Sequence, residues 1–343
     1  MSRAVTMKDV AVAAGVSVMT VSRAFKADKS VSKITRLRIM QIADDLGYMF
    51  DSTAATLRTQ RTGFVAVTIP SINNANFADS VTAMSDVLAK VDMQVLLGNT
   101  NYDIHKEEEL ISHLLQRRPE AIVVTGGRHT ERARKMLMGA RIPVFETWDL
   151  PDEPLGHVVG FSNAATMDAM VEYLSHCGYR RISFIGGDTD GDTRGADRRR
   201  GFIRAMTRHG LDPSRLIGAG VPPISMSEGA AAMARLLEQL PDTEAVICVS
   251  DLSAFGALTE CMRRGIAVPR DMAIAGFGAY EIAGISVPTI TTINPYPAFI
   301  GRCTAEYIMK LLQRGSSQEK FRLEVRPDLI IGGSTRFQDE ARF

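Results

Sequence analysis

The 343-residue sequence lacks the features of membrane-spanning proteins, of secreted proteins and of proteins stabilised by zinc sites. No apolar run approaches the roughly 18 residues of a membrane helix, and residues 1–10 hold Arg3, Lys8 and Asp9 rather than the apolar core of a signal peptide. The four cysteines show no CxxC spacing, so we expect them to be reduced and mostly buried. These absences predict a cytoplasmic protein without membrane association.

Motifs of the common enzyme classes are also absent. The sequence has no phosphate-binding P-loop, no GxSxG elbow, no HExxH pair and no GxGxxG after a strand. The acidic stretch 188–193 lacks the glycine and glutamate that a calcium loop needs at its sixth and twelfth positions, where this chain has Thr193 and Arg199. We therefore expect no catalytic residues, no metal site and no cofactor, although carboxylates lining a cleft would leave an enzyme possible.

Charge is distributed unevenly along the chain. Residues 1–61 hold ten lysines and arginines against five aspartates, a net charge of +5. The remainder has 30 basic and 34 acidic residues, a net charge of −4. A basic segment attached to a mildly acidic body indicates that the segment binds a polyanion, the alternative being a chance excess on a solvated face.

The basic segment is predicted to form three short helices. Thr6 is placed to cap a helix over 7–14, and Ser17 a second over 18–25. A third is expected over 32–46, with four apolar residues at helical spacing: Ile34, Leu37, Ile42 and Leu46. Two helices joined by a turn that contains glycine form a helix-turn-helix pattern.

From residue 63 onward, strand-like runs alternate with amphipathic segments, which is typical of parallel sheets built from β-α-β units. Two such series predict an α/β body of two doubly wound lobes with a cleft between them. The helix after the strand 181–185 is predicted over 197–209. The tail is expected to cross back and complete both sheets. The predicted strands are 64–69, 94–98, 121–125, 144–146, 157–161, 181–185, 245–250, 273–277, 289–293 and 322–326.

Segments along nearly the whole chain resemble the lactose/galactose repressor family of bacterial transcription regulators. The resemblance is carried by residues 6–11 (TMKDVA), 15–23 (GVSVMTVSR), 31–36 (VSKITR), 44–48 (DDLGY), 251–257 (DLSAFGA), 268–277 (VPRDMAIAGF) and 291–293 (TTI). Within the family, residues 18–23, 144–149 and 273–277 look most like the branch of gluconate-utilisation repressors.

The resemblance implies a particular division of the chain. A helix-turn-helix DNA-binding domain would span 1–48 and a hinge 49–62, followed by a two-lobed effector-binding and dimerisation domain over 63–343, similar to periplasmic binding proteins. The first lobe would comprise about 63–160 and 294–324, and the second about 161–290 and 325–336.

In this family the second helix of the head lies in the major groove of DNA. Val18 and Met19 open that helix, and because both are apolar we expect them to contact thymine methyl groups, while Arg23 can bond guanine. Hydroxyl groups are suited to phosphate oxygens, but a helix cap is the alternative for each of them, as core packing is for Val18 and Met19. The predicted DNA-binding residues of the head are Thr6, Ser17, Val18, Met19, Thr20, Ser22, Arg23, Ser32, Thr35 and Tyr48.

Residues 48–61 are expected to be a linker or a weak helix. In the family, the equivalent of residues 50–60 forms a hinge helix on the operator, with a leucine wedged into the minor groove, and Leu57 matches that leucine. This chain departs from the family's usual Pro-Asn-Arg-Ala start, having FDST at 50–53. Asp51 is unfavourable near phosphates, so we expect it to cap the hinge helix.

The family binds its effector in the cleft, outside the carboxyl ends of the strands. The candidate effector-binding residues on the first lobe are Asn73, Asn76, Phe77, Arg128, His129, Glu146, Trp148 and Asp149. Those on the second lobe are Arg198, Ser250, Asp251 and Gly278, with Asn294 near the crossover. Alternatives stay open for three of them: Arg198 as an exposed arginine, Trp148 as interlobe core, and Asp251 as the cap of the helix that follows it.

Two departures from the family bear on the effector. Ser250 stands where many sugar-binding members have an asparagine, and Gly278 where they have an aspartate. An aspartate accepts hydrogen bonds from neutral sugar hydroxyls but repels a carboxylate, so its absence beside Arg198 favours an anionic ligand. We expect a sugar acid such as gluconate, or its phosphate, although Glu146 and Asp149 argue partly against an anion.

The sequence thus predicts a ligand-responsive, homodimeric repressor of carbohydrate-utilisation genes that binds a pseudo-palindromic operator in double-stranded DNA. A two-lobed sugar-binding or sugar-metabolising protein without DNA binding is the alternative. Steeply salt-dependent binding to a palindromic duplex would separate the two, because each phosphate contact adds about −0.9 to the log–log slope.

Overall fold

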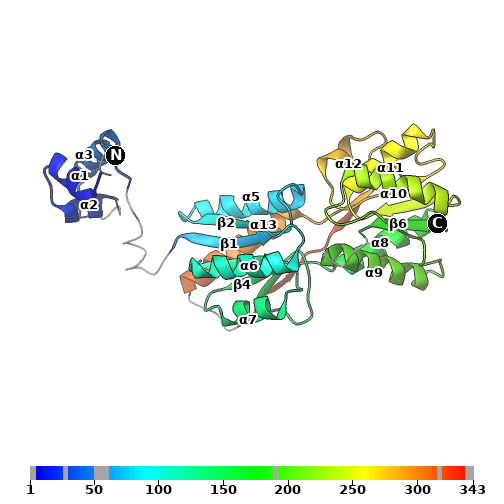
Figure 1. Ribbon diagram of the computed structural model, residues 1–343, viewed down its shortest axis with the longest axis horizontal. Helices are drawn as coiled ribbons and strands as arrows, with labels where there is room; N and C mark the ends of the chain where they lie inside the picture. Colours follow the sequence, from blue (N-terminus) through cyan, green and yellow to red (C-terminus); the bar gives the residue numbers. More distant parts are fainter. Residues whose placement is uncertain (1–4, 26–29, 50–61, 188–191, 315–318, 337–343) are drawn as a thin grey trace, which may run out of the picture. The chain divides into compact units, whose positions relative to one another are not determined.

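The computed structural model describes residues 5–25, 30–49, 62–187, 192–314 and 319–336. The chain divides into two units, a head of residues 1–61 and a body of residues 62–343 (Figure 1). Within the described ranges, no helix combines the length and the apolar character needed to cross a bilayer.

The head packs three helices around a small apolar core: α1 (Met7–Ala13), α2 (Val18–Phe25) and α3 (Lys33–Asp45). Val21 and Ala24 of α2 and Ile39 and Ala43 of α3 are among its buried side chains. The sequence predicted the helices, but its set of apolar residues in the third one is only partly buried: Ile42 packs against this core, whereas Ile34 and Leu37 are 82% and 62% exposed. Two sets of residues in α3 satisfy the helical spacing, and the set containing alanine is the buried one.

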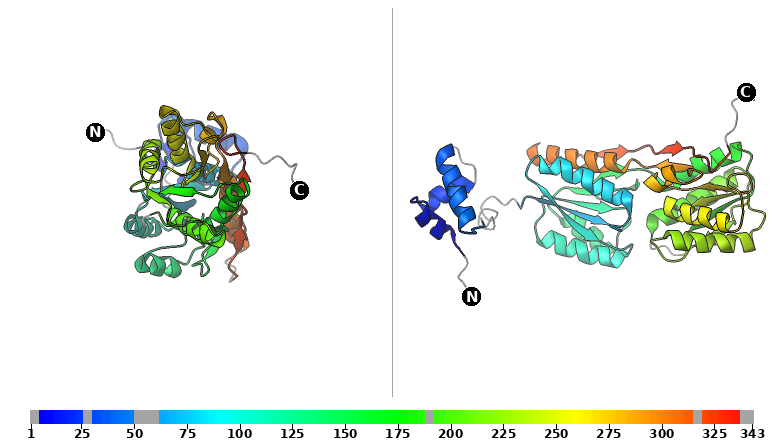
Figure 2. Two further views of the ribbon diagram at one scale, coloured as in Figure 1. Left: turned by 90° about the vertical axis from the view of Figure 1, so that its right-hand side faces the viewer. Right: turned by 90° about the horizontal axis from the view of Figure 1, so that it is seen from above.

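The first lobe of the body is a six-stranded parallel sheet in the order β11-β5-β4-β3-β1-β2. Helices α5 and α13 pack against each other on one face, and α6 and α7 on the other (Figures 1 and 2). The strands are β1 (Phe64–Ile69), β2 (Gln94–Asn99), β3 (Ala121–Thr125), β4 (Val144–Thr147), β5 (His157–Gly160) and β11 (Arg322–Glu324). The helices are α5 (Ala75–Ala89), α6 (Ile104–Gln116), α7 (Glu131–Gly139) and α13 (Pro297–Arg314).

The second lobe is a four-stranded parallel sheet in the order β7-β6-β8-β9. Helices α8 and α9 pair on one face, and α10 and α11 on the other, with α12 beside α11 (Figure 1). The strands are β6 (Ile182–Gly186), β7 (Leu216–Gly218), β8 (Ala245–Cys248) and β9 (Ala273–Ala275). The helices are α8 (Asn163–His176), α9 (Thr193–Arg208), α10 (Met226–Gln239), α11 (Asp251–Arg263) and α12 (Glu281–Ile285).

The central strands owe their apolar sequences to these helices. Every residue of β3, β4, β6 and β8 is buried. A parallel sheet covered on both faces has no solvent side, so its strands are continuous apolar runs rather than alternating ones. This is why strand positions could be predicted from the sequence.

In the described part of the chain, the tail adds a strand to the first sheet but not to the second, whereas it was expected to complete both. Strand β11 joins the edge of the first sheet beside β5. At the second sheet the tail adds no strand within the described residues, only a bridge between Ala275 and Thr291. Instead β10 (Thr292–Asn294) and β12 (Asp328–Ile330) pair antiparallel as a ribbon of their own, because the chain crosses between the lobes there.

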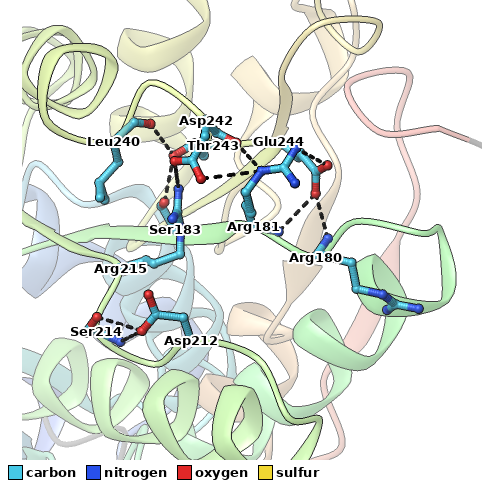
Figure 3. A network of polar contacts seen from close by, with 10 residues as sticks. All are labelled: Arg180, Arg181, Ser183, Asp212, Ser214, Arg215, Leu240, Asp242, Thr243 and Glu244. Atoms are coloured by element: carbon cyan, nitrogen blue, oxygen red, sulfur yellow. Dashed lines mark hydrogen bonds and ion pairs between the residues drawn. The ribbon is translucent and has the colours of Figure 1, made fainter.

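Charged side chains tie together the amino ends of the second lobe's strands (Figure 3). Before β6, Arg181 Nη2 lies 2.5 Å from Glu244 Oε1, and Glu244 Oε2 accepts the backbone N–H groups of Arg180 and Arg181. Before β7, Arg215 Nη2 donates to Asp242 Oδ1 at 2.8 Å and to Thr243 Oγ1 at 2.9 Å. This end of the sheet is thus held by ion pairs within the protein.

Candidate functional site

The start of α2 presents apolar side chains to solvent. Val18 and Met19 are 44% and 62% exposed, whereas Val21 and Ala24 of the same helix are buried. Core packing therefore does not account for Val18 and Met19, while Arg23 at the other end of the helix is also exposed. Exposed apolar side chains at the beginning of such a helix suit contact with base edges and thymine methyl groups.

Several of the predicted phosphate-binding hydroxyl groups cap helices. Ser17 Oγ accepts the Thr20 N–H and Ser32 Oγ accepts the Thr35 N–H, each at 3.1 Å. Thr6 forms a capping box with Asp9 at the start of α1. Because both serine side chains remain exposed, the caps leave room for contact with a phosphate.

The remaining predicted DNA-binding residues differ in their surroundings. Tyr48 is half-buried, and its ring meets that of Phe25 edge-on, with ring centroids 5.8 Å apart. Ser22 is likewise half-buried on α2. Leu57 and the whole proposed hinge helix lie outside the described residues, so their predicted roles remain predictions.

The body contains a cavity of about 260 Å³ between the carboxyl ends of the strands of its two lobes. This volume is slightly below the roughly 300–1,000 Å³ of typical small-molecule sites, so it suits a small ligand. Six of the predicted effector-binding residues line it: Asn73, Asn76, Phe77, Trp148, Arg198 and Ser250. The loops after β1, β4 and β8, together with helices α5 and α9, bring these residues together.

Aromatic rings from both lobes form one wall of the cavity. Phe77 and Trp148 of the first lobe meet edge-on with centroids 5.0 Å apart, and Trp148 lies 6.2 Å from Phe161. Phe161 in turn lies 6.1 Å from Phe277 of the second lobe. Trp148 is only 4% exposed and also lines the cavity. Its two predicted roles, as interlobe core and as a cavity residue, are therefore compatible.

Arg198 is buried within the cavity wall rather than exposed on α9. Its Nη1 donates to Asn163 Oδ1 at 2.6 Å, and its guanidinium carbon lies 4.4 Å from the centre of the Phe277 ring. Asn163 is itself fixed, because its amide donates to the carbonyl of Trp148 at 2.9 Å. Burial lowers the pKa of Arg198, but an arginine keeps its charge in proteins. Its Nε has no hydrogen-bond partner among the described residues.

Gly278, a predicted effector residue, is not part of the cavity lining, but it leaves room for Tyr280, which is. A Cβ at this position would lie 2.6 Å from Cε1 of Tyr280, so the ring of Tyr280 occupies the space that a larger residue would need. The Tyr280 hydroxyl donates to Asn74 Oδ1 of the first lobe at 2.8 Å. Burial raises the pKa of Tyr280, which stays protonated and able to donate.

Asp251 is buried outside the cavity and holds the Tyr280 loop in place. Its Oδ2 accepts the Tyr280 N–H at 2.8 Å, and its Oδ1 accepts the Thr292 hydroxyl at 2.6 Å. Ser250, not Asp251, is the N-cap of α11. Burial raises the pKa of Asp251 to about 6.

His129 and Glu146, predicted as effector ligands, instead form a buried charge cluster in the first lobe. His129 Nδ1 lies 2.8 Å from Glu107 Oε2, and its Nε2 lies 3.7 Å from Glu146 Oε1. Burial alone would lower the pKa of His129, but the two carboxylates outweigh it and raise the pKa to about 9. Glu146 lies within β4 rather than after it, and its Oε2 accepts the N–H of Leu155.

The other predicted effector residues also lie outside the cavity wall. Arg128 forms an ion pair with Asp197 of the second lobe. The carboxylate of Asp149 accepts the N–H groups of Gly127 and Leu150, which shapes its own loop. Asn294 Oδ1 accepts the N–H of Tyr296. These side chains are therefore used within the protein.

Sequence reasoning missed several residues of the cavity: Asn74, Tyr102, Asn163, Asp192, Arg194 and Tyr280. Arg194 had a usable signal, since it lies one turn before Arg198 on the same helix. The prediction began that helix at residue 197, whereas α9 begins at Thr193. Tyr102 is marked only in the structure, by a φ of 61°, which bulky residues rarely adopt and which is often found at functional sites.

The described ranges show no candidate metal-binding site. They contain no group of three or more histidine, cysteine, aspartate or glutamate side chains arranged to hold a metal ion. The cavity instead offers amides, hydroxyls, aromatic rings and guanidinium groups, which bind polar organic molecules.

Comparison with known proteins agrees with this architecture. Residues 6–50 match the model for bacterial regulatory proteins of the lacI family, and residues 171–335 match a periplasmic binding protein-like domain. The chain is 33% identical over 310 residues to the HTH-type transcriptional regulator IdnR of Escherichia coli K12, which covers 90% of this chain and 92% of that protein. The chain belongs to the lacI family of transcriptional regulators.

Two further matches bear on the family and on the fold. The HTH-type transcriptional regulator GntR of Pseudomonas aeruginosa is 33% identical over 307 residues, covering 90% of this chain and 89% of the relative. The crystal structure of the lac repressor dimer bound to operator and the anti-inducer ONPF matches with a TM-score of 0.83 over 97% of this chain and 99% of that one. At 21% identity this second match shows the fold alone. The family and the α/β architecture expected from the sequence are confirmed.

Proposed function

We propose that this lacI-family regulator is a homodimeric repressor whose two heads bind the halves of a pseudo-palindromic operator. The exposed Val18 and Met19 at the start of α2 support this, because the three-helix core leaves them free for base edges. Two-fold related heads require two-fold related half-sites in the DNA. The protein acts on DNA in the cytoplasm and catalyses no reaction.

The effector is a sugar acid of the gluconate type, bound in the cavity between the lobes. The observation that carries this proposal is Arg198, a buried arginine in the cavity wall whose Nε has no partner among the described residues. A carboxylate would supply a charge-assisted hydrogen bond there. The amides of Asn73 and Asn76 are placed to bind hydroxyl groups of the same ligand.

Effector and operator are coupled through the lobes. Because the cavity wall comes from both lobes, a ligand that fills it changes how firmly the two lobes are held together. This change is passed on to the heads and alters operator binding. Coupling of this kind is reciprocal: an effector that weakens operator binding must bind more weakly to the operator-bound protein.

The first experiment measures DNA binding by the full-length protein. Duplexes selected from a random-sequence pool are titrated by fluorescence anisotropy at about 50 and 200 mM salt, where phosphate contacts predict a steep loss of affinity. Gluconate, glucose and ribose are then added in parallel. We expect selection of a palindromic sequence and a change of at least about tenfold in operator affinity with gluconate, which corresponds to a coupling within the usual range.

A head variant serves as the control. Replacing Val18 and Met19 together by alanine should weaken operator binding by at least about tenfold through lost apolar contacts with bases. Val12→Ala, at another exposed apolar position, should leave binding unchanged. A protein without sequence preference for DNA would contradict the repressor, and a stronger response to glucose or ribose would contradict the sugar-acid effector.

A further inference from the structure

Arg194 is a second buried arginine in the cavity, and it reaches from one lobe to the other. It lies on α9 of the second lobe and is 7% exposed. Its Nη1 donates to the carbonyl oxygen of Thr125, at the carboxyl end of β3 in the first lobe, at 3.3 Å. Gly126 permits this approach, because a Cβ there would lie 2.9 Å from Nη1. The guanidinium group is therefore held at the junction of the lobes.

The cavity supplies these two arginines with little negative charge of its own. Asp192 is the one carboxylate among the described residues that line it. Its Oδ1 lies 3.4 Å from Arg194 Nη2, and its Oδ2 lies 3.9 Å from Arg198 Nη2. Charge-assisted hydrogen bonds between arginine and carboxylate measure about 2.7–2.9 Å, so neither guanidinium has such a bond with Asp192.

A bound anion would complete this arrangement. A guanidinium group offers a planar fork of donors that matches the two oxygens of a carboxylate. Arg198 has an unused Nε donor, and Arg194 makes a single hydrogen bond, to a neutral carbonyl, within the described part of the chain. Burying charge without close partners is costly, and a ligand carboxylate between the two arginines would offset that cost.

We infer that Arg194 is the residue that selects an acid over a neutral sugar, by binding the carboxylate of the effector together with Arg198. The inference rests on the proposed sugar-acid effector and goes further by assigning its recognition to a residue on the lobe junction. The rest of a polyhydroxylated ligand would lie against Asn73, Asn76 and the aromatic wall. Because Arg194 also contacts Thr125, a carboxylate bound there connects the two lobes.

Isothermal titration calorimetry on the full-length protein tests this assignment. Gluconate, glucose and glucose 6-phosphate are titrated into the wild type and into Arg194→Gln, Arg194→Lys and Arg204→Gln. Arg204 serves as the matched control, since it is an arginine on the same helix with a 58% exposed side chain paired with Asp168. Thermal unfolding and operator binding establish that each variant is folded.

We expect Arg194→Gln to weaken gluconate binding by about 30-fold, the loss of a hydrogen bond to a charged group. Glucose binding should change by less than about threefold, because a neutral ligand has no charge-assisted bond to lose. Arg194→Lys should fall between the two, since it keeps the charge without the planar fork. Arg204→Gln should bind gluconate as the wild type does.

The outcomes separate this inference from the proposed function. If Arg194→Gln weakens gluconate and glucose equally, or leaves gluconate binding unchanged in a folded protein, Arg194 is not the selecting residue even though the sugar-acid effector stands. If the wild type binds glucose 6-phosphate instead of gluconate and Arg194→Gln removes that binding, Arg194 still anchors an anion and the carboxylate class is wrong. A wild type that binds neither anion overturns both.

Discussion

The two ends of the second lobe's sheet both hold buried arginines, but the distances from these arginines to carboxylates differ. At the amino end, Arg215 donates to Asp242 at 2.8 Å and to Thr243 at 2.9 Å (Figure 3). At the carboxyl end, Arg198 Nη2 lies 3.9 Å from Asp192 Oδ2. Both arginines leave Nε without a partner in the described structure, so the difference lies in the carboxylate.

This difference indicates two uses of the same residue type. A buried arginine paired closely with a carboxylate of its own chain stabilises the fold, because without that carboxylate the charge of the arginine would be buried and unpaired. An arginine held by an amide and an aromatic ring, beside a cavity, keeps donors for a ligand. Mutation should therefore separate stability from effector response at the two ends.

The largest effect is expected at the carboxyl end. Arg198→Gln should weaken gluconate binding by about 100-fold, since a buried carboxylate would lose two charge-assisted donors. The free energy of unfolding of the unliganded protein should change by no more than about 1 kcal/mol, because Arg198 lacks a close carboxylate to leave behind. Effector titration of operator binding gives the first quantity, and urea unfolding gives the second.

An unfolding free energy that falls by several kcal/mol while gluconate binding persists would contradict this division. Arg200→Gln provides a comparison at a neighbouring position of α9, because its side chain is 58% exposed and does not line the cavity. We expect that variant to respond to gluconate as the wild type does.

His129 of the first lobe is a third buried cation, and its contribution to stability should depend on pH. It lies between Glu107 and Glu146, and its pKa rises from 6.5 to about 9 in the folded protein. A raised pKa means that the folded state binds the proton more tightly, so this stabilisation is complete below pH 6.5 and is lost as the pH rises through about 9. We expect His129→Gln to lower the free energy of unfolding below pH 6.5, and the difference from the wild type to shrink as the pH rises through about 9.

Urea unfolding across this pH range measures the difference, and His105→Gln supplies an exposed histidine on α6 as control. A difference between wild type and His129→Gln that stays constant with pH would show that folding does not raise the pKa of His129. Effector binding should be insensitive to His129→Gln, because the side chain does not line the cavity.

Much of the fold could be predicted because its physical causes are local. Apolar runs predicted the covered strands of both sheets, and Ser17 with the residues after it predicted α2 at its observed bounds. The face of α3 could not be settled in this way, since Ile34 and Ile39 fit helical spacing equally well. The tertiary neighbours of a helix, which the sequence does not display, decide which set is buried.

The site could be predicted in position but only in part by residue. Residues after strand ends do meet at the cavity, as Asn73, Trp148 and Ser250 show. Spacing alone could not tell that the Glu146 side chain is used in buried contacts of the first lobe, or that His129 meets Glu107 from a helix 22 residues earlier. Arg194 was missed because the predicted start of its helix was too late.

The smallest effect is expected at the amino end, where Arg215 and Arg181 offer a matched pair. The side chain of Arg215 is 8% exposed and that of Arg181 is 49% exposed, while both pair with carboxylates. Arg215→Gln should lower the free energy of unfolding by about 1.5 kcal/mol, because a buried carboxylate-paired donor is lost. Arg181→Gln should lower it by about 0.5 kcal/mol, as for an exposed ion pair screened by water. Urea unfolding measures both, and gluconate titration should show wild-type affinity for each variant. Equal losses of stability would mean that burial does not set the strength of these pairs, and a loss of gluconate affinity would remove the distinction between the two ends of the sheet.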